Sequence, residues 1–230
     1  MHSGGMRRLL LTGLLALSFP FLGAAQEGRL PLFGKVKDKV YTAPSGAYRI
    51  TSPVLEELGG TISDSENAVV FQDKFTIHIT IGCFQQDATQ RWEFSTRGPK
   101  DYLSYFFSTY VFPDFQQAYP DTKVENVEYA PKLMDGTMVV FTLIPGGSMF
   151  THRLAELAPG APPYVAKRGN MLFVRHGYVY VISLEYAERL TEGHTFKLTL
   201  AEENAQIRKR LEDVIRLMEF ARPAPEPAQP

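Results

Sequence analysis

The chain has 230 residues, 44% of them hydrophobic and 21% charged, and its formal net charge at pH 7 is −1. This length and composition suit one globular domain with a single hydrophobic core. The balanced charge excludes the strongly basic surface that nucleic acid or an anionic membrane favours in a partner. Cys83 is the only cysteine, so no intramolecular disulfide can form and the fold depends on its core.

The N-terminal segment, residues 1–25, has the pattern of a secretory signal peptide. Arg7 and Arg8 precede an apolar stretch at 9–22, and small residues follow it. The apolar stretch is shorter than the roughly 20 residues that span a bilayer, which favours a cleaved signal over a membrane anchor. We therefore predict cleavage near Ala25 and a secreted or periplasmic product, with no membrane span after signal removal.

The ends of the remaining chain differ in composition from its middle. Residues 26–38, which carry Gly, Lys and Pro31, predict a leader into the domain. Residues 222–230 are so rich in proline that they predict a disordered tail. The segment between them, 39–221, has mixed apolar patterns and no internal repeat. We predict that it forms a single domain.

In chain order, the turn signals of this domain predict antiparallel hairpins. Asp135-Gly136 is the strongest of them, because Asp-Gly favours the two-residue turn that joins paired strands. Asp73-Lys74 and residues 175–177 mark two further turns. We predict strands at 48–51, 66–72, 75–83, 124–133, 137–144, 170–174 and 178–184.

Two helices are predicted, near 98–118 and 200–220. The first begins at Gly98-Pro99, since proline favours the first helical position. The second begins at a capping box, in which Thr199 and Glu202 bind each other's backbone, and it carries a one-sided apolar stripe. The first helix is apolar over about half its circumference. Two rows of residues produce this face: Tyr102, Phe106 and Tyr110, and Leu103, Phe107 and Val111.

The strand patterns predict which parts of the sheet are covered. In the strand at 75–83, apolar residues alternate with Thr76, His78 and Thr80, which predicts one dry and one wet face. Residues 138–144 and 178–184 are nearly continuous apolar runs, as in strands buried on both faces. We predict an α+β fold, an α/β/α sandwich around a mainly antiparallel sheet.

Three segments carry a resemblance to a known family: Gly-Ala-Tyr-Arg-Ile-Thr-Ser-Pro at 46–53, Ala-Val-Val-Phe-Gln-Asp at 68–73, and Gly-Tyr-Val-Tyr-Val-Ile-Ser-Leu at 177–184 before a final amphipathic helix. Together they resemble the Mog1/PsbP-like superfamily over about residues 40–220. The resemblance implies an α/β/α sandwich and a binding or assembly module rather than an enzyme. It carries no shared set of functional residues.

The sequence contains no recognised catalytic or metal-binding motif. Cys83 continues the inward alternation of its strand, which predicts a core residue rather than a nucleophile. None of the four histidines after residue 25 lies at a zinc-ligand spacing from another His or Cys, and no Gly-x-Ser-x-Gly occurs. His78 and His176 are expected at the surface. We predict no catalytic residue, no metal site and no cofactor.

Residues 145–167 form a predicted long loop or insertion bounded by Pro and Gly. A connection of this length inside a compact domain is either functional or loose. Trp92 is the other candidate, as an interface anchor or as a cap on the core beneath the first helix. The loop is favoured as a solvated insertion, and the alternative is a cationic rim for an acidic partner or an anionic ligand. The candidate binding residues are Trp92, Phe150, His152, Arg153, Lys167 and Arg168.

Three function classes follow from these patterns. The leading hypothesis is an exported, non-enzymatic binding or assembly module for a protein partner. The alternative is a carrier of a small apolar ligand, held under the 145–167 segment by the aromatic face of the first helix. The third is a hydrolase or metalloenzyme whose site assembles only in the fold. The aromatic residues of the carrier hypothesis are Tyr102, Phe106, Phe107 and Tyr110.

Overall fold

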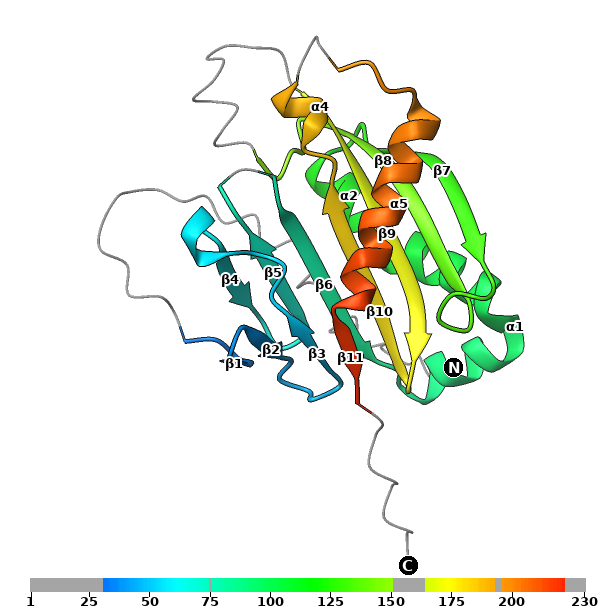
Figure 1. The fold of residues 1–230 in the computed structure, drawn as a ribbon. Coiled ribbons are helices and arrows are strands. Elements are labelled where there is room, and N and C mark those ends of the chain that lie inside the picture. Colours follow the sequence, from blue (N-terminus) through cyan, green and yellow to red (C-terminus); the bar gives the residue numbers. More distant parts are fainter. Residues whose placement is uncertain (1–30, 75, 151–163, 193–195, 222–230) are drawn as a thin grey trace, which may run out of the picture.

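The computed structural model describes residues 31–74, 76–150, 164–192 and 196–221 (Figure 1). A seven-stranded antiparallel sheet in the order β4-β5-β6-β10-β9-β8-β7 forms its centre, and a second antiparallel sheet has the order β1-β2-β3-β11. The larger sheet contains β4 (Thr61–Asp64), β5 (Ala68–Gln72), β6 (His78–Gln85), β7 (Lys123–Ala130), β8 (Thr137–Pro145), β9 (Val165–Arg175) and β10 (Tyr178–Glu185). The smaller contains β1 (Lys35–Lys37), β2 (Val40–Thr42), β3 (Tyr48–Thr51) and β11 (Met218–Phe220).

Helical segments cover both faces of the larger sheet. One face lies under α1 (Ala88–Phe106), the π-helix η2 (Phe107–Val111) and α2 (Phe112–Ala118), which Figure 1 shows behind the sheet. The other face packs on α5 (Leu200–Arg216) and on the smaller sheet, so the molecule has two hydrophobic cores, one on each side. Two short helices, η1 (Glu56–Leu58) and α4 (Glu188–Thr191), complete the described elements. The predicted α+β sandwich is confirmed.

The predicted hairpins are present. Most strand ends shift by only a few residues, but β9 begins at Val165, five residues before the predicted strand, so the last three residues of the predicted loop 145–167 belong to the sheet. β5 pairs with β6, β7 with β8, and β9 with β10, each around the turn that the sequence indicates. Met138–Ile144 and Tyr178–Leu184 lie in strands buried on both faces, with the exception of half-buried Leu143 and Tyr178. The prediction from their apolar runs is therefore confirmed.

The predicted wet face of β6 is wrong. Thr80, expected in solvent, is 8% exposed, and the strand begins at His78 rather than at residue 75. The cause is the position of β6 between β5 and β10 in the sheet interior, where both of its faces are covered. Threonine alternating with isoleucine fits a covered strand as well as an exposed one, because threonine is common in both.

Two helix boundaries also differ from the prediction. α1 starts at Ala88, ten residues early, where Asp87 and Gln90 form a capping box; Gly98, with φ 76°, is a kink inside the helical segment. α5 stops at Arg216, and Met218–Phe220 pair with β3 instead. The apolar stripe continues through Met218, so the sequence cannot distinguish a last helical turn from a strand that completes a small sheet.

Part of the predicted leader belongs to the folded domain. The backbone amides of Phe33 and Gly34 donate hydrogen bonds to the carboxylate of Asp64, at 2.9 and 2.7 Å, and β1 pairs with β2. Residues 1–25 and 222–230 lie outside the described residues, so signal peptide and tail stay predictions. No helix in the described ranges has the length and hydropathy to cross a membrane.

The contact between α5 and β9 depends on Gly169. A Cβ atom at this position would lie 2.1 Å from Ile207 Cγ2 and 3.0 Å from Leu211 Cδ1. We expect Gly169→Ala to lower the free energy of unfolding by about 1–3 kcal/mol, because the added methyl overpacks this contact. Urea unfolding checks this.

The matched control for this prediction is the double variant Gly169→Ala with Ile207→Ala. Removing Ile207 Cγ2 makes room for the new methyl. The double variant should therefore lose less free energy of unfolding than the sum of the losses of the two single variants. Strict additivity of the two changes would show that Gly169 does not set the approach of the helix.

Candidate functional site

The predicted cationic rim does not form, because Lys167 and Arg168 are buried on opposite faces of the larger sheet. Successive residues of a strand point to opposite faces. Lys167, 0% exposed, lies under α5, where its Nζ donates to Glu203 Oε2 at 2.9 Å and to the Leu200 carbonyl at 3.1 Å. Glu125 Oε2 lies 3.2 Å from the same atom. Lys167 is therefore part of a buried ion cluster between β7, β9 and α5.

Arg168 belongs to a second buried cluster, on the α2 face. It donates through Nη2 to the carbonyl of Gly147, and its Nε lies 3.9 Å from Glu185 Oε2. Burial lowers the pKa of Arg168 and raises that of Glu185, and each charge partly counters the other's shift. Ser148 Oγ donates to Glu185 Oε1 at 2.7 Å, and the Met149 amide donates to Oε2. The cluster thus fixes the backbone that follows β8.

His78 and Phe150 lie beside this cluster, His78 half-buried and Phe150 buried. Their rings meet edge to face, with centroids 6.1 Å apart. Burial lowers the pKa of His78 to about 3, and the charge of Arg168 lowers it as well. The surface position predicted for His78 is therefore only partly met, because the side chain is half-buried at the start of β6. His152 and Arg153 lie outside the described residues.

The low pKa of His78 predicts acid sensitivity. The unfolded chain takes up a proton below about pH 6.5, whereas folded His78 stays neutral down to about pH 3, so stability falls with pH in this window. Between pH 6.5 and about pH 5, the wild type should lose about 2 kcal/mol more stability than His78→Gln. Denaturant unfolding at both pH values measures this difference.

His176→Gln is the control for this measurement, because His176 lies at the tip of the β9–β10 hairpin. It should follow the wild type. Glu185, whose pKa is raised in the folded protein, has the opposite effect and adds stability as pH falls. Because all three proteins contain Glu185, this effect does not contribute to the difference between them. Parallel profiles for the wild type and His78→Gln would contradict the burial of a neutral histidine.

Cys83 points into the core, as predicted. It is 6% exposed, and burial raises its thiol pKa to about 12. A thiol with this pKa is almost entirely protonated at neutral pH, which disfavours nucleophilic chemistry. Within the described ranges, no group of three or more His, Cys, Asp or Glu residues could hold a metal ion.

The aromatic face of the first helix is core rather than pocket. Tyr102, Phe106 and Phe107 are at most 5% exposed and pack against the sheet. Tyr110 is half-buried, and its ring lies 5.1 Å from that of Phe106. The predicted ligand position under this face is wrong, because the rings fill the space between helix and sheet.

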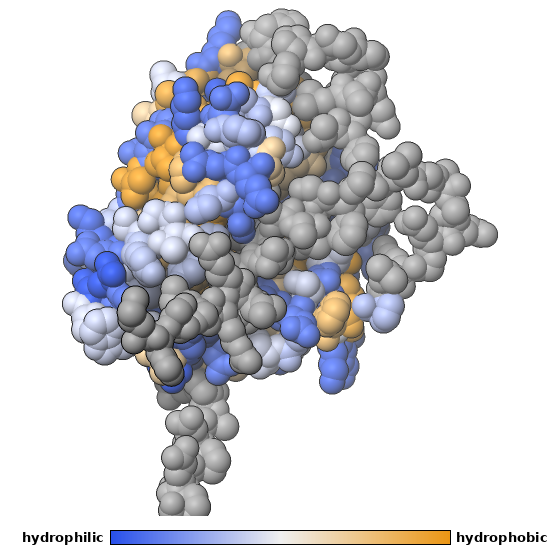
Figure 2. Space-filling model, turned by 180° about the vertical axis from the view of Figure 1, so that it is seen from behind, coloured by the Kyte–Doolittle hydropathy of each residue, from blue (hydrophilic) through white to orange (hydrophobic). Residues whose placement is uncertain are grey.

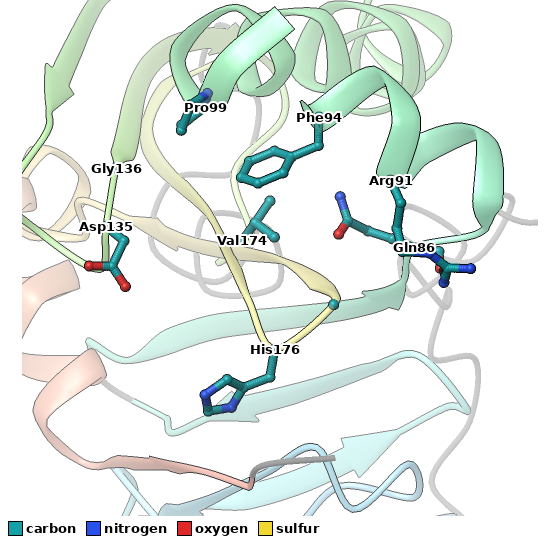
Figure 3. A pocket seen from close by; sticks show the side chains of 9 residues that line it. Gln86, Arg91, Phe94, Pro99, Asp135, Gly136, Val174 and His176 are labelled. Atoms are coloured by element: carbon teal, nitrogen blue, oxygen red, sulfur yellow. Dashed lines mark hydrogen bonds between the residues drawn. The ribbon is translucent and has the colours of Figure 1, made fainter. Parts of the chain in front are cut away.

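A pocket of about 430 Å³ lies instead at the hairpin end of the sheet, far from the Arg168 cluster (Figure 3). This volume is within the range of ligand-binding sites. We call it the hairpin pocket. It lies between the first part of α1, the end of β6 and the tips of the β7–β8 and β9–β10 hairpins. Its lining residues are Gln86, Arg91, Phe94, Pro99, Asp135, Gly136, Val174, His176 and Gly177.

Gln86 is the buried polar group of the pocket. It is 3% exposed, and its side chain is a hydrogen-bond partner of buried Tyr102, whose pKa this contact lowers although burial raises it overall. Figure 3 shows its amide directed toward Phe94 and Val174. The backbone of Gln86 is held on both sides: its amide donates to the Gly177 carbonyl at 2.9 Å, and its carbonyl accepts from Arg91 Nη1 at 2.8 Å. The side chain therefore starts from a fixed position.

The rim of the pocket is charged, but its charges have partners. Asp135 Oδ2 accepts from Arg175 Nη1 at 2.8 Å across the two hairpin tips. His176 Nδ1 lies 2.9 Å from the Ala221 carbonyl. Phe94 packs edge to face on Tyr102, with ring centroids 5.3 Å apart, so the apolar wall joins the core.

Trp92 lies on the outer side of the same helical segment, 62% exposed. Phe94 is two residues further on, about 200° around the helix, so the two side chains face opposite ways. The interpretation of Trp92 as a cap on the core is therefore wrong. It failed because α1 was expected to begin only at residue 98, which left the orientation of residues 88–97 undefined.

A second exposed apolar feature is the edge strand β7. Val124 and Val127 are 41% and 51% exposed, and both pair with residues whose side chains face α1 and α2. Figure 2, which views the molecule from that side, shows hydrophobic surface gathered toward the left, where β7 lies. A bulge between Val124 and Asn126 interrupts the regular strand. Bulges of this kind protect sheet edges from pairing with another chain.

No protein-family model and no curated protein sequence matches the chain. Solved structures do match it. A PsbP from Synechocystis (CyanoP) has 12% identity and a TM-score of 0.46, over 87% of this chain and 99% of that one. The Ran-binding protein Mog1p of Saccharomyces cerevisiae has 11% and 0.41, over 84% and 97%. A Mog1 point mutant has 10% and 0.41, over 82% and 98%.

The chain is similar in fold to Mog1 and PsbP structures. The likeness concerns the fold alone, and it assigns no partner, ligand or activity to this chain.

Proposed function

We propose that the chain is an exported, non-enzymatic binding module that recognises a protein partner through Trp92 and the adjacent hairpin pocket. One observation carries the proposal: a tryptophan that is 62% exposed on the helix that also forms the pocket wall. Tryptophan is enriched among the residues that dominate binding energy at protein interfaces. A solvent-exposed side chain of this size contributes little to the core, so its value lies in contact with a partner.

The helical segment that carries Trp92 is a rigid platform. Asp87 and Gln90 cap its first turn through reciprocal hydrogen bonds of 2.7 and 3.2 Å, and Arg91 binds the carbonyl of Gln86. Rigid presentation favours affinity, because little conformational freedom is lost on binding. The segment ends at the kink at Gly98.

Two chemical observations support a non-enzymatic role. The Cys83 thiol is buried with a pKa raised to about 12, and the Ser148 hydroxyl donates to the carboxylate of Glu185 rather than to a histidine. The buried charges of Lys167 and Arg168 have carboxylate partners. Export is supported by the signal pattern at 1–25.

Trp92→Ala should weaken partner binding about 30-fold or more, as expected for the loss of an interface anchor. A photo-reactive amino acid at position 92, introduced in the native host, captures the partner for this measurement. The variant should unfold at the same urea concentration as the wild type, because Trp92 contributes little to the core.

Position 127 provides the matched control, since Val127 is also apolar and 51% exposed but lies on the edge strand β7. A photo-reactive residue there should give no adduct, and Val127→Ala should change affinity less than twofold (about 0.4 kcal/mol). Equal capture at the two positions, or unchanged affinity of Trp92→Ala, would refute the proposed surface.

A further inference from the structure

The hairpin pocket lies beside Ala221, the last residue that the structure describes. His176 lines the pocket, and its Nδ1 lies 2.9 Å from the carbonyl oxygen of Ala221. The Ala221 amide donates to the Ala47 carbonyl at 2.9 Å, which fixes the position of this residue. Figure 1 shows the end of β11 at the same end of the molecule as the tip of the β9–β10 hairpin. Residues 222–230 therefore begin next to the pocket.

The pocket offers apolar contact rather than a directed hydrogen bond. Its walls include the rings of Phe94 and Pro99 and the side chain of Val174. The buried amide in the wall, that of Gln86, is already a hydrogen-bond partner of Tyr102. A ligand for these walls gains free energy by removing apolar surface from water, and it should bring few N–H groups that need an acceptor.

Residues 222–230 have this composition. Their sequence is Arg-Pro-Ala-Pro-Glu-Pro-Ala-Gln-Pro, in which four of the nine residues are proline. Proline has no N–H, and its fixed φ favours the extended polyproline II form. Segments of this form bind grooves lined by aromatic rings, because they lose little conformational freedom on binding. The segment therefore matches the walls of the pocket that it adjoins.

Length and charge allow the segment to cross the pocket. Polyproline II rises about 3.1 Å per residue, so residues 222–227 extend roughly 19 Å. This exceeds the width of a pocket of about 430 Å³. Figure 3 shows Asp135 and Arg91 on opposite sides of the pocket, with Phe94 between them. Arg91 is exposed, and its Nη1 binds a backbone carbonyl rather than a carboxylate, which leaves this guanidinium open to an ion pair with Glu226.

We propose that residues 222–230 of the same chain bind in the hairpin pocket. Their prolines pack on the apolar wall formed by Phe94 and Pro99, and Glu226 pairs with Arg91. The segment then covers the pocket that the proposed function assigns to the protein partner, so the partner must displace it. This regulatory role rests on the proposed function, whereas the docking of the segment does not.

Amide NMR of the full chain tests the docking. The wild type is compared with a serine variant, which keeps the length of the segment but lacks the proline rings nearest the pocket. Its substitutions are Pro223→Ser, Pro225→Ser and Pro227→Ser. The resonances of Phe94, Val174 and Gly177 should differ between the two proteins, and those of β7 should not. Differences confined to β11 and its neighbours in the smaller sheet would overturn the proposal.

Three controls make this comparison specific. Ala224→Ser keeps every proline and should leave the pocket resonances unchanged. Val174→Phe fills the pocket, so the serine substitutions should shift Phe94 much less in this background; a dispersed spectrum confirms that the variant is folded. Glu226→Lys should move the pocket resonances at least half way to those of the serine variant, and no movement contradicts the assigned ion pair. Shifts that depend on protein concentration would mean that a second copy supplies the segment, which overturns docking within one chain.

The partner captured at position 92 separates this inference from the proposed function. The serine variant should bind the partner about fivefold more tightly than the wild type, because its pocket is no longer covered. If NMR shows docking but the partner affinity does not change, the proposed surface is wrong and the docking stands. If Trp92→Ala weakens the partner but the serine substitutions leave the pocket resonances unchanged, the docking is wrong and the proposed function stands.

Discussion

Replacing Glu203 by glutamine is expected to lower the free energy of unfolding by about 3–5 kcal/mol, because it leaves a buried lysine charge without its nearest carboxylate. Lys167 is 0% exposed and Glu203 1%, and their charged atoms lie 2.9 Å apart. Arg189 Nε also lies 2.8 Å from Glu203 Oε1, so the substitution removes a carboxylate that Lys167 and Arg189 share. Glu125, at 3.2 Å from Lys167 Nζ, can compensate only in part. Urea unfolding at neutral pH measures the loss.

The control for this prediction is an exposed ion pair of the same chemistry. Arg49 and Glu219 contact each other on the smaller sheet, with side chains 56% and 72% exposed. Glu219→Gln should cost less than about 1 kcal/mol, because water screens and replaces the interaction. Lys167→Met in the Glu203→Gln background should recover part of the loss. If Glu203→Gln lowers the free energy of unfolding by less than Glu219→Gln does, the buried charge of Lys167 does not depend on Glu203.

Arg168→Met is expected to lower the free energy of unfolding at neutral pH by a similar amount, about 3–5 kcal/mol. The substitution leaves the carboxylate of Glu185 buried in the other core without its cationic partner. The cost should shrink as pH falls. Without the guanidinium, the pKa of Glu185, already raised by burial, rises further, and the folded variant takes up a proton that relieves the buried charge. Unfolding measured across the acidic range checks both the size and the sign.

The same variant should loosen the segment that follows β8. Arg168 binds the Gly147 carbonyl, and Glu185 binds both Ser148 and the Met149 amide. Hydrogen exchange at Met149 should accelerate in Arg168→Met and much less in Arg168→Lys, which keeps a charge beside Glu185. Protection at Met149 that does not change would mean that the backbone here is held by other contacts.

The local signals of the sequence predict most of the larger sheet. Asp135-Gly136 and the turn at 175–177 each join two strands that pair along their length, and the apolar runs of β8 and β10 correspond to strands covered on both faces. These features are local: a turn requires particular residues, and a covered strand requires apolar ones. The buried position of Cys83 is also predicted from a local pattern, the alternation of apolar residues along its strand.

The errors arise where two structures share one local pattern. Gly98-Pro99 marks a helix start in many chains, and here it marks a kink. Met218 extends an apolar helical stripe, and here it pairs with Ile50 in a strand. Thr80 suggests solvent and is buried, since its neighbours in the sheet cover it. In each case a contact from distant sequence selects between the alternatives.

The candidate site was the least predictable part. Lys167 and Arg168 adjoin a Pro- and Gly-bounded segment, which favours an exposed cationic rim, but their carboxylate partners Glu203 and Glu185 come from α5 and β10. The hairpin pocket is assembled from three separate stretches of chain, and Gln86 has no motif around it. Of the candidate binding residues that the structure describes, Trp92 alone lies beside that pocket, and nothing in the sequence places it there.

The most direct test of the account is hydrogen exchange of the full chain, free and in complex with the partner captured at position 92. We expect added protection at residues 86–97 and 174–177, around Trp92 and the hairpin pocket, and unchanged exchange along β7. Protection confined to β7, or to the backbone beside the Arg168 cluster, would contradict it.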